Sequence, residues 1–443
     1  MQEIQELEEK PERAIIVGVK LADMSKAEAE ESLQELALLA DTAGVEVVSQ
    51  VLHQRPAPNP AYFVGSGKAQ ELQSLSAEAQ ADVLIFDNDL SPAQTRNLEK
   101  ITDIRVIDRT TLILDIFAQR ARTKEAKVQV ELAQLQYALP RLTHQWTHLE
   151  RLGGGAGAGK VGGVGTRGPG ETQLQIDRQL IRGRIAHLKR ELEEIEQHRT
   201  VQRRHRKEMM SAAIVGYTNA GKSTLLNALT DEHVFTEDKL FATLDPTTRI
   251  VQLPENHTIF LTDTVGFIKR LPHHLVASFK ATLEEVTSAD LLLHIVNASH
   301  KEALNQIKAV NQVLEELGAV NKPTLMLFNK IDKLALERSE GMESYNELYV
   351  LHSEYPDGIA ISALTGEGLE QLKSRLVEFI SQNDVRISLV LSHKDGGKVL
   401  NYIYTHGEVL DESYKDNSVL VEAKIHSRYL KQLKKLAPTG VSL

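Results

Sequence analysis

The chain has 443 residues, a length that predicts about three domains, and 42% of them are hydrophobic and 25% charged, a balance that excludes a disordered protein. Cysteine is absent, which excludes disulfides, thiolate metal sites and cysteine nucleophiles. The first residues lack a signal-peptide pattern and no run of about 18 apolar residues occurs, so we expect a cytoplasmic protein without stable membrane insertion.

The charge is unevenly distributed along the chain. The net charge is -10, yet residues 120–208 contain 18 Lys and Arg against 10 Asp and Glu. A basic middle segment within an acidic protein predicts one localised anionic partner surface.

Residues 1–122 are expected to form an α/β domain. The apolar runs AIIVGVK, VEVVSQV, DVLIFD and IRVID alternate with helical patterns near 26–42, 67–80, 91–100 and 109–122. This alternation favours a mostly parallel sheet covered by helices. The stretch Gly65–Lys68 resembles a phosphate-binding loop but lacks its full spacing, so a structural turn is the favoured interpretation there.

Residues 123–208 are expected to form a helical hairpin. A helix is predicted over 124–139, and the segment 153–170 contains ten glycines, Lys160 and Arg167, and no acidic residue. Such a segment lacks the apolar side chains of a core.

A long second helix of the hairpin is predicted next. Thr172 and Gln175 have the spacing of a capping box, which places the start of this helix near them. Its apolar stripe should pack on the 124–139 helix. The helix ends in the basic run RRHRK, which contains Arg203 and Arg204, and we favour RNA contact there over a merely solvated helix end.

Residues 209–382 carry the nucleotide-binding motifs of an α/β domain. The sequence GYTNAGKS, between the strand SAAIV and the helix STLLNALT, fits the P-loop pattern in its proper context. Its residues are Gly216, Tyr217, Thr218, Asn219, Ala220, Gly221, Lys222 and Ser223. Backbone N–H groups of this loop would hold the α- and β-phosphates, Lys222 would reach the β- and γ-phosphates, and Ser223 would bind Mg²⁺.

A second motif follows the strand IFLTD. It comprises Asp263, Thr264, Val265 and Gly266. The Asp263 carboxylate can hold Mg²⁺ through water, and the Gly266 backbone N–H can meet a γ-phosphate.

Base recognition is predicted at two further strand ends. The sequence NKID gives Asn329, Lys330, Ile331 and Asp332. Asp332 can accept two hydrogen bonds from the N1–H and 2-amino group that guanine has and adenine lacks, which favours GTP over ATP. Ser362, Ala363 and Leu364 would complete the pocket through a backbone N–H.

The sequence leaves two features of hydrolysis open. The segment LFATLDPTTR should contain a threonine that senses Mg²⁺ and the γ-phosphate, and spacing does not choose among Thr243, Thr247 and Thr248. Phe267 stands where many GTPases have the glutamine that orients the attacking water, so no catalytic side chain is assigned. A partner group, another loop residue or an extra cation must act instead. Asn219 either binds such a cation, with K⁺ the candidate, or stabilises its own turn.

Residues 383–443 are expected to form a small α+β domain. The strand candidates are ISLVL and SVLVEAKI, with a helical stretch near 395–405 between them.

These motifs, together with GGGAGAGKVGGVGTRGPGETQLQIDR, closely resemble the HflX family of translational GTPases over almost the whole chain. The resemblance implies that Phe241, Ala242, Thr243, Leu244 and Asp245 contact the nucleotide and that Thr243 is the second metal ligand. It also implies a hydrophobic residue in place of the glutamine, as at Phe267, and ATP binding by the N-terminal domain. One departure is Asn297, where the family pattern leads us to expect an acidic residue.

The resemblance implies a monomeric GTPase that binds GTP, GDP and the large ribosomal subunit with its RNA, and that splits stalled or idle ribosomes under stress. Lys160, Arg167, Arg203 and Arg204 would contact the RNA. We weigh three alternatives: a GTP-gated ribosome-binding or assembly factor without splitting, a GTPase that regulates membrane or signalling partners, and an ATP-driven RNA remodeller.

Overall fold

The structure is a computed structural model. It describes residues 11–142, 169–206, 209–230, 240–255, 257–270, 280–334, 345–382, 384–392, 396–415, 418–436 and 441–442. The chain divides into two compact units. The first comprises residues 1–196 with 238–245 and 269–280, and the second comprises 197–237, 246–268 and 281–443. The segments 238–245 and 269–280 therefore belong to the N-terminal unit, although in the sequence they lie before and after the motif Asp263–Gly266 of the second unit.

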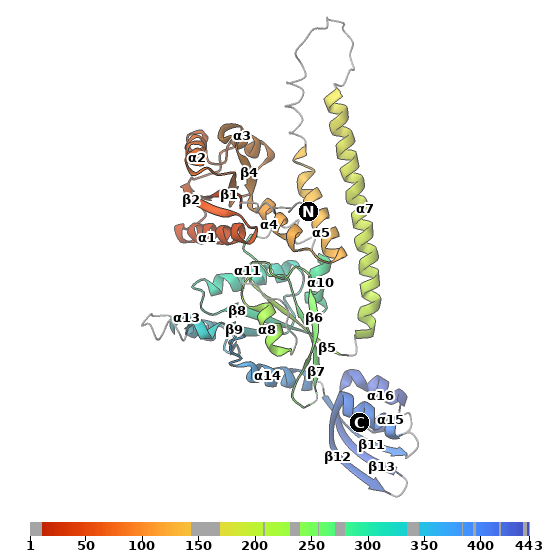
Figure 1. Ribbon diagram of the computed structural model, residues 1–443. Coiled ribbons are helices and arrows are strands. Elements are labelled where there is room, and N and C mark those ends of the chain that lie inside the picture. The colour runs from red at the N-terminus through yellow and green to blue at the C-terminus, as the bar shows by residue number, and fades with distance from the viewer. Residues whose placement is uncertain are drawn as a thin grey trace, which may run out of the picture. The chain divides into compact units, whose positions relative to one another are not determined.

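The N-terminal unit contains a four-stranded parallel sheet (Figure 1), which confirms the expected fold class. Its strands, in the order β2-β1-β3-β4, are β1 (Arg13–Lys20), β2 (Glu46–Gln54), β3 (Val83–Phe86) and β4 (Arg105–Asp108). The helices are α1 (Lys26–Thr42), α2 (Ser66–Ala79), α3 (Pro92–Thr102) and α4 (Arg109–Arg120). The central strands are buried on both faces, which explains their unbroken apolar runs.

Alternate residues of β1 face opposite sides of the sheet. Ile15 and Val17 share an apolar cluster with Leu72 of α2 and Leu98 of α3. Ile16 is equally buried but points to the other side, because successive side chains of a strand alternate. Two layers of helix thus cover this sheet, as βαβ connections require.

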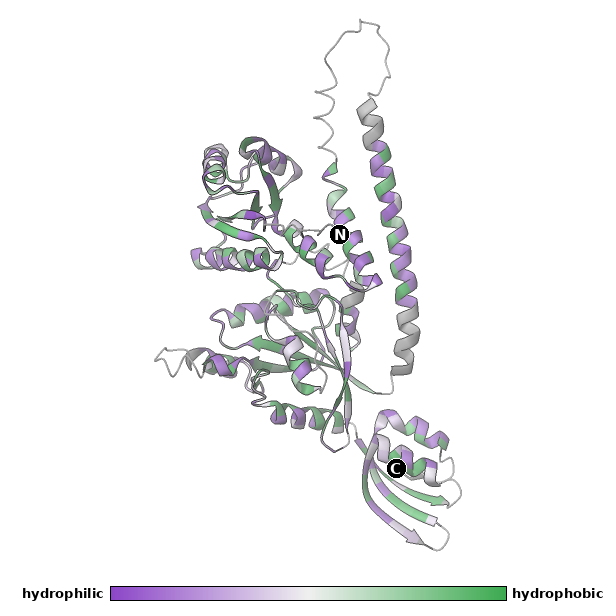
Figure 2. Ribbon diagram, viewed as in Figure 1, coloured by the Kyte–Doolittle hydropathy of each residue, from purple (hydrophilic) through white to green (hydrophobic). Residues whose placement is uncertain are grey.

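The expected hairpin is formed by α5 (Lys124–Ala138) and α7 (Pro169–Arg206), of which α5 and residues 169–196 of α7 belong to the first unit. Val128 and Leu132 of α5 pack with Leu188 of α7, which is completely buried. Arg184 adds two hydrogen bonds of 2.7 and 2.8 Å to the Glu131 carboxylate. In the coloured part of α7, Figure 2 shows polar residues with apolar ones between them, as expected of a helix that buries one narrow stripe.

The start of α7 differs from the prediction. The helix begins at Pro169, so Thr172 lies inside it and the predicted capping box was wrong as a helix start. Proline is well suited to the first turn of a helix because its missing N–H would have no partner there.

The second unit contains a six-stranded sheet in the order β10-β9-β8-β5-β7-β6. Its strands are β5 (Met210–Gly216), β6 (Thr247–Gln252), β7 (Thr258–Asp263), β8 (Leu291–Asn297), β9 (Thr324–Asn329) and β10 (Ile359–Ala360). The edge strand β6 is antiparallel to β7, and the other described pairings are parallel. The helices are α8 (Lys222–Leu229), α10 (Lys280–Ser288), α11 (Ala303–Glu316), α13 (Tyr345–Glu354) and α14 (Leu369–Ser381).

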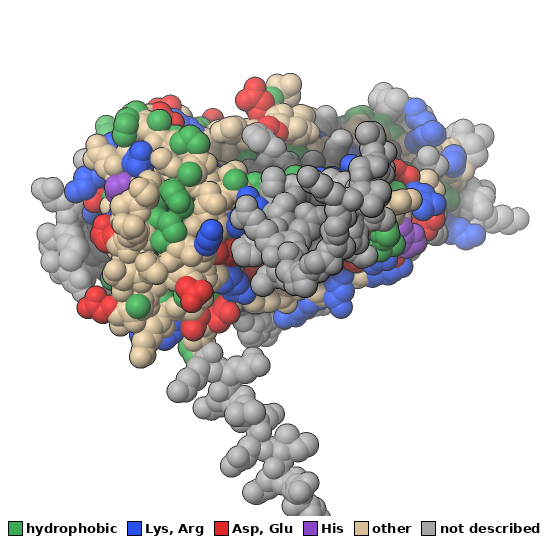
Figure 3. Space-filling view, turned by 90° about the horizontal axis from the view of Figure 1, so that it is seen from above, with side chains coloured by type: hydrophobic (Ala, Val, Ile, Leu, Met, Phe, Trp, Pro, Cys, Tyr) green, Lys and Arg blue, Asp and Glu red, His purple; other side chains and the backbone are tan. Residues whose placement is uncertain are grey.

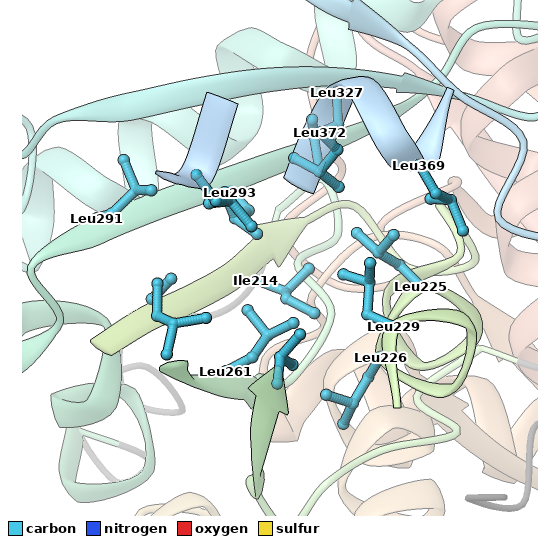
Figure 4. Packing of buried hydrophobic residues seen from close by; sticks show 14 of the residues in the cluster. Ile214, Leu225, Leu226, Leu229, Leu261, Leu291, Leu293, Leu327, Leu369 and Leu372 are labelled. Carbon is cyan, nitrogen blue, oxygen red and sulfur yellow. The ribbon is translucent and has the colours of Figure 1, made fainter. Parts of the chain in front are cut away.

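The core of this sheet brings together leucine and isoleucine side chains from strands and helices. Figure 4 shows Ile214 of β5 and Leu261 of β7 facing Leu225 and Leu226 of α8, and all four are completely buried. This packing fixes α8 against the strands. The carboxyl ends of β5, β7, β8 and β9 consequently meet at one edge, the position where ligands bind in open α/β sheets.

The C-terminal part of the same unit is an antiparallel sheet in the order β12-β13-β11-β14, which agrees with the expected α+β domain. Its strands are β11 (Asp384–Ser392), β12 (Gly407–Lys415), β13 (Ser418–His426) and β14 (Val441–Ser442), and its helices are α15 (Gly396–His406) and α16 (Leu430–Leu436), the latter preceded by a 3₁₀ turn, Ser427–Tyr429.

The described surface mixes charges of both signs. Acidic, basic and apolar side chains are interspersed over the face in Figure 3. Among the described residues, no helix is long and apolar enough to cross a membrane.

Candidate nucleotide site

The predicted P-loop connects β5 to α8 at the carboxyl edge of the sheet. Gly216 has φ +154° and Gly221 has φ +99°, conformations that side chains rarely adopt. A Cβ at Gly216 would lie 2.3 Å from the carbonyl oxygen of Ile295, and one at Gly221 would lie 2.2 Å from the Asn329 amide nitrogen. Both glycines are therefore required by the close packing of the loop on its neighbours.

Lys222 is buried at the first position of α8 and turns back over its own loop. Its Nζ donates hydrogen bonds to the carbonyl oxygens of Tyr217, at 2.7 Å, and Gly216, at 3.3 Å. Burial lowers the pKa of Lys222 to about 8, and the Asp263 carboxylate opposes this shift. A buried ammonium surrounded by loop carbonyls is prepared to accept an anion, because an anion offsets the cost of burial.

The hydroxyl of Ser223 and the carboxylate of Asp263 meet across the loop. Ser223 Oγ donates a 2.6 Å hydrogen bond to Asp263 Oδ2. The next residue, Thr264, is anchored to β5 by a 2.7 Å hydrogen bond from Oγ1 to the carbonyl oxygen of Ile214. Oxygen donors of this kind are the ones that Mg²⁺ prefers, so the residues present fit a magnesium site.

Asn329 connects three loops at the same edge. Its side chain donates to the carbonyl oxygen of Ala220, at 2.8 Å, and accepts from the backbone N–H of Ala363, at 2.9 Å. Asp332 Oδ1 accepts a 2.6 Å hydrogen bond from the Ser362 hydroxyl. The P-loop, the NKID segment and residues 362–364 thus lie together, with Ile331 bonded through its N–H to the carbonyl oxygen of Ile361.

Lys330 and Asn219 also meet. Lys330 adopts a left-handed conformation, φ +67°, and its Nζ donates a 3.0 Å hydrogen bond to Asn219 Oδ1. The Asn219 oxygen therefore already faces one cation, an ammonium. Leu364 is 78% exposed, which leaves its backbone as the part suited to base contact.

Phe267, four residues after the end of β7, forms an isolated bridge with Tyr217 of the P-loop. Its backbone N–H donates to the Gly216 carbonyl, at 3.1 Å, and its carbonyl accepts from the Thr218 N–H, at 2.8 Å. The phenyl ring is 1% exposed. Phe267 therefore serves packing and positions the loop, and its side chain offers no polar atom to water. Gly266, just before it, would place a Cβ 2.9 Å from Lys222 Nζ.

Residues 240–245, which precede β6, belong to the N-terminal unit and contact its side chains and backbone. Phe241 packs edge-on against Phe117 with ring centroids 4.8 Å apart. The Leu240 N–H donates to Thr42 Oγ1 at 3.3 Å, and the Asp245 carboxylate accepts from the backbone N–H groups of Arg122 and Thr123, each at 3.1 Å.

The three threonines that sequence spacing left open occupy different settings. Thr247 and Thr248 lie within β6, where Thr247 pairs with Asp263 and the Thr248 hydroxyl lies 2.9 Å from that of Thr262. Thr243, between Ala242 and Leu244, lies outside any helix or strand. The pairing of β6 thus holds Thr247 and Thr248, whereas Thr243 is not part of a strand, and its role in sensing the γ-phosphate stays a prediction.

Several predicted residues cannot be placed in this site. Lys160 and Arg167 lie outside the described residues. Arg203 and Arg204 belong to α7. The stretch Gly65–Lys68 is the start of α2, with Gly65 as its N-cap, and not the expected turn. Lys68 pairs with Glu71 at 2.6 Å, and Arg55 donates to the Val64 carbonyl at 2.6 Å.

Two polar residues of β8, His294 and Asn297, lie near the nucleotide site. His294, in the middle of the apolar run LLLHIV, is 1% exposed, and burial, followed by repulsion from Lys222, lowers its pKa to about 4. A lone polar residue in a buried strand is a signal that sequence reasoning could have used. Asn297, which replaces the expected acid, accepts hydrogen bonds from the N–H and hydroxyl of Ser299, at 3.2 and 2.8 Å, as an aspartate would.

Family models match three consecutive parts of the chain. They are described as "GTP-binding GTPase N-terminal" for residues 30–118, "GTP-binding GTPase Middle Region" for 120–206 and "50S ribosome-binding GTPase" for 211–330.

Two relatives with similarity over most of this chain are both named GTPase HflX. The chain is 44% identical to the GTPase HflX of Lacrimispora saccharolytica over 98% of both chains, and 48% identical to that of Escherichia coli K12 over 83% of both. A crystal structure of a GTP-binding protein from Sulfolobus solfataricus with GDP aligns with 84% of this chain and 99% of its own, with 26% identity and a TM-score of 0.44. The chain belongs to the HflX family, and it is therefore a P-loop GTPase that hydrolyses GTP.

Proposed function

We propose that this GTPase binds the large ribosomal subunit in its GTP-bound state and dissociates stalled or idle ribosomes under stress. Binding energy separates the subunits, and hydrolysis of GTP to GDP and phosphate resets the protein. The observation that carries the proposal is the combination of a "50S ribosome-binding GTPase" match over 211–330 with two packed helices, α5 and α7, whose connecting sequence is basic and glycine-rich. Cytoplasmic location and a monomeric state are part of the proposal.

In the proposed nucleotide complex, the anion displaces the Lys222 ammonium from the carbonyl oxygens of Gly216 and Tyr217. Backbone N–H groups at the start of α8 hold the phosphates. Asp332, oriented by Ser362, accepts the N1–H and 2-amino group of guanine, and the Ala363 backbone lies beside the base. Asn329 keeps these loops in register.

The magnesium ligands are proposed to be Ser223 and Thr243, with Asp263 acting through water. When bound, the ion neutralises negative charge that develops between the β- and γ-phosphates. The 2.6 Å contact between Ser223 and Asp263 supports this assignment, because it places a hydroxyl and a carboxylate close enough to share one ion.

The group that replaces the missing glutamine is proposed to be a K⁺ ion held partly by Asn219. The Asn219 oxygen accepts a hydrogen bond from Lys330, so this position already attracts positive charge. A monovalent ion there would supply charge that the buried ring of Phe267 lacks.

RNA contact is proposed for the basic residues of the hairpin, Lys160, Arg167, Arg203 and Arg204. A glycine-rich segment with two cations and no acid can follow a narrow RNA-lined channel. Because such contacts release counterions, affinity for the ribosome should fall as salt rises.

Sucrose-gradient sedimentation of idle ribosomes tests the proposal. With GTP or a non-hydrolysable analogue, the protein should convert whole ribosomes into subunits, and the analogue should support one round. A double variant, Lys160→Gln with Arg167→Gln, should split less and bind more weakly. Ribosome binding without any conversion into subunits would favour the alternative, a GTP-gated binding or assembly factor.

A further inference from the structure

A cavity in the second unit lies apart from the nucleotide site. It has a volume of about 270 Å³ and lies between the β6–β7 turn and the C-terminal sheet. Gln252 and Thr258, which pair at this end of β6 and β7, line it, whereas Thr247 and Asp263 pair at the other end. Five residues of strand separate the two ends, or about 17 Å, so the cavity and the P-loop are distinct places.

Two polar side chains face the cavity from neighbouring strands. Asp384 of β11 is directly opposite His426 of β13 in the antiparallel register. Ile387 and Ile425, which have the other parity on the same strands, belong to the helix-covered core. Asp384 and His426 therefore point together to the opposite face, with Cβ atoms about 4.5–5.5 Å apart.

His426 offers a hydrogen-bond donor that no described protein atom accepts. The Arg428 N–H donates to His426 Nδ1 at 3.2 Å, so the ring proton is on Nε2. His426 is 7% exposed, and Nε2 is buried without a hydrogen-bond partner in the described part of the chain. Burial and the Arg428 charge lower the pKa of His426, which favours the neutral ring. Arg428 itself is fixed by Asp290 at 2.9 Å.

Asp384 supplies the complementary acceptor. Its side chain is 10% exposed, and Oδ2 lies 3.8 Å from Nε2 of His257 on the β6–β7 turn. Oδ1 is buried and has no hydrogen-bond partner among the described residues. A buried donor and a buried acceptor, side by side and without partners, carry a desolvation cost that a ligand can remove.

Apolar and aromatic side chains line part of the cavity, and Gln252, Glu255, His257, Thr258 and Thr405 add polar ones. Met210, Ile250 and Ile380 contribute the apolar lining, and Tyr429 and His406 contribute rings that meet edge-on at 4.9 Å. A volume near the lower end of the range for ligand pockets suits a molecule smaller than a typical drug. In the described residues, no group of three or more His, Cys, Asp or Glu is arranged to hold a metal ion, so the lining favours an organic ligand.

We propose that this cavity binds a nucleobase, a flat heterocycle with an N–H beside a carbonyl or ring acceptor. The N–H donates to Asp384 Oδ1, the acceptor receives the His426 Nε2 proton, and the ring lies against the Tyr429 side. The base belongs either to a free nucleoside or to a single-stranded RNA. The inference is independent of ribosome splitting.

Saturation-transfer NMR on the full chain tests this site, with excess GDP present to fill the P-loop site. Uridine has an N3–H beside a carbonyl, and 3-methyluridine lacks that proton. Uridine should show transfer, and methylation should weaken binding at least about tenfold, because it leaves Asp384 Oδ1 unpaired. Equal signals from the two nucleosides, or none from either, would overturn the proposal and leave ordered water as the partner of both groups.

A variant pair locates the binding. Asp384→Ala should abolish the uridine signal, and Asp411→Ala, which removes an exposed carboxylate from neighbouring β12, should preserve it. Uridine transfer that survives Asp384→Ala would contradict the assigned site. A short oligouridine distinguishes the source. Tighter binding than uridine indicates an RNA base, and binding of uridine alone indicates a free nucleoside.

Discussion

Lys222 Nζ donates a 2.7 Å hydrogen bond to the carbonyl oxygen of Tyr217, five residues before it, so the P-loop lysine is paired with its own loop. This contact does not offset burial, which lowers the pKa of Lys222 to about 8. The site is therefore electrostatically incomplete without an anion, and two consequences can be measured.

The affinity for GDP should fall as pH rises above about 8. Lys222 loses its proton near that pH in the free protein, whereas bound phosphates favour the charged form. Binding must then take up a proton, and the dissociation constant should rise by up to tenfold per pH unit. Calorimetry at pH 7, 8 and 9 measures this, with guanosine, which lacks phosphates, as the matched control. The same slope for both ligands would contradict the role of Lys222.

The lowered pKa of Lys222 also makes the free energy of unfolding depend on pH. An unfolded lysine titrates near 10.5, so between about 8 and 10.5 the unfolded chain binds more protons than the nucleotide-free folded chain. The free energy of unfolding of the second unit should therefore rise with pH across that window in the wild type. In Lys222→Met, the contribution of this residue to that rise should be absent.

Asp332→Asn should move nucleotide preference away from guanine. The amide keeps one acceptor oxygen but replaces the other with an NH2 donor, so a donor would face the 2-amino group of guanine. We expect at least a tenfold loss of GTP affinity and improved relative binding of xanthosine triphosphate, which has a carbonyl at that position. Ser362→Ala, which removes only the 2.6 Å hydrogen bond to Asp332, should weaken GTP less and keep the preference. Unchanged guanine selectivity in Asp332→Asn would refute the assignment.

GTP turnover should be faster in KCl than in NaCl at equal ionic strength. The Asn219 oxygen, which accepts from Lys330 at 3.0 Å, would be one ligand of the larger ion. Asn219→Ala should remove the difference between the two salts. Asn227→Ala, on α8 of the same domain, is the matched amide control and should retain it. Equal rates in both salts for the wild type would return Asn219 to a turn-stabilising role.

The local stability of the hairpin of α5 and α7 should depend on Leu188. This side chain is completely buried between Val128 and Leu132, so Leu188→Ala should cost about 2–5 kcal/mol in local stability. Leu180→Ala, which truncates a 67% exposed leucine on the same helix, should cost less than about 0.5 kcal/mol. Amide hydrogen exchange in α5 and α7 resolves this, because a chain of two units need not unfold in one step.

Much of this fold was predictable because its signals are local. The strands of the N-terminal sheet are continuous apolar runs, and the P-loop was recognisable because residue spacing, a preceding strand and a following helix coincide. β12 was missed, since GEVLDESYK is largely acidic and polar; it forms a strand through cross-strand pairing with β13.

Long-range contacts were not predictable from one sequence. The Asp245 carboxylate meets the backbone of Thr123 across 122 residues, and no spacing rule relates them. Asp384 and His426 become neighbours only through strand register. Residue spacing likewise does not separate Thr243 from Thr247 and Thr248; the two latter residues lie in β6, and the assignment of Thr243 stays a prediction from the family resemblance.

The most direct test of the account is GTP hydrolysis by the purified protein with and without purified large ribosomal subunits. The subunits should stimulate hydrolysis several-fold, and the stimulation should vanish when residues 153–170 are deleted while the basal rate persists. Hydrolysis that large subunits leave unchanged would contradict a ribosome-directed role, although the nucleotide site itself would remain that of a GTPase.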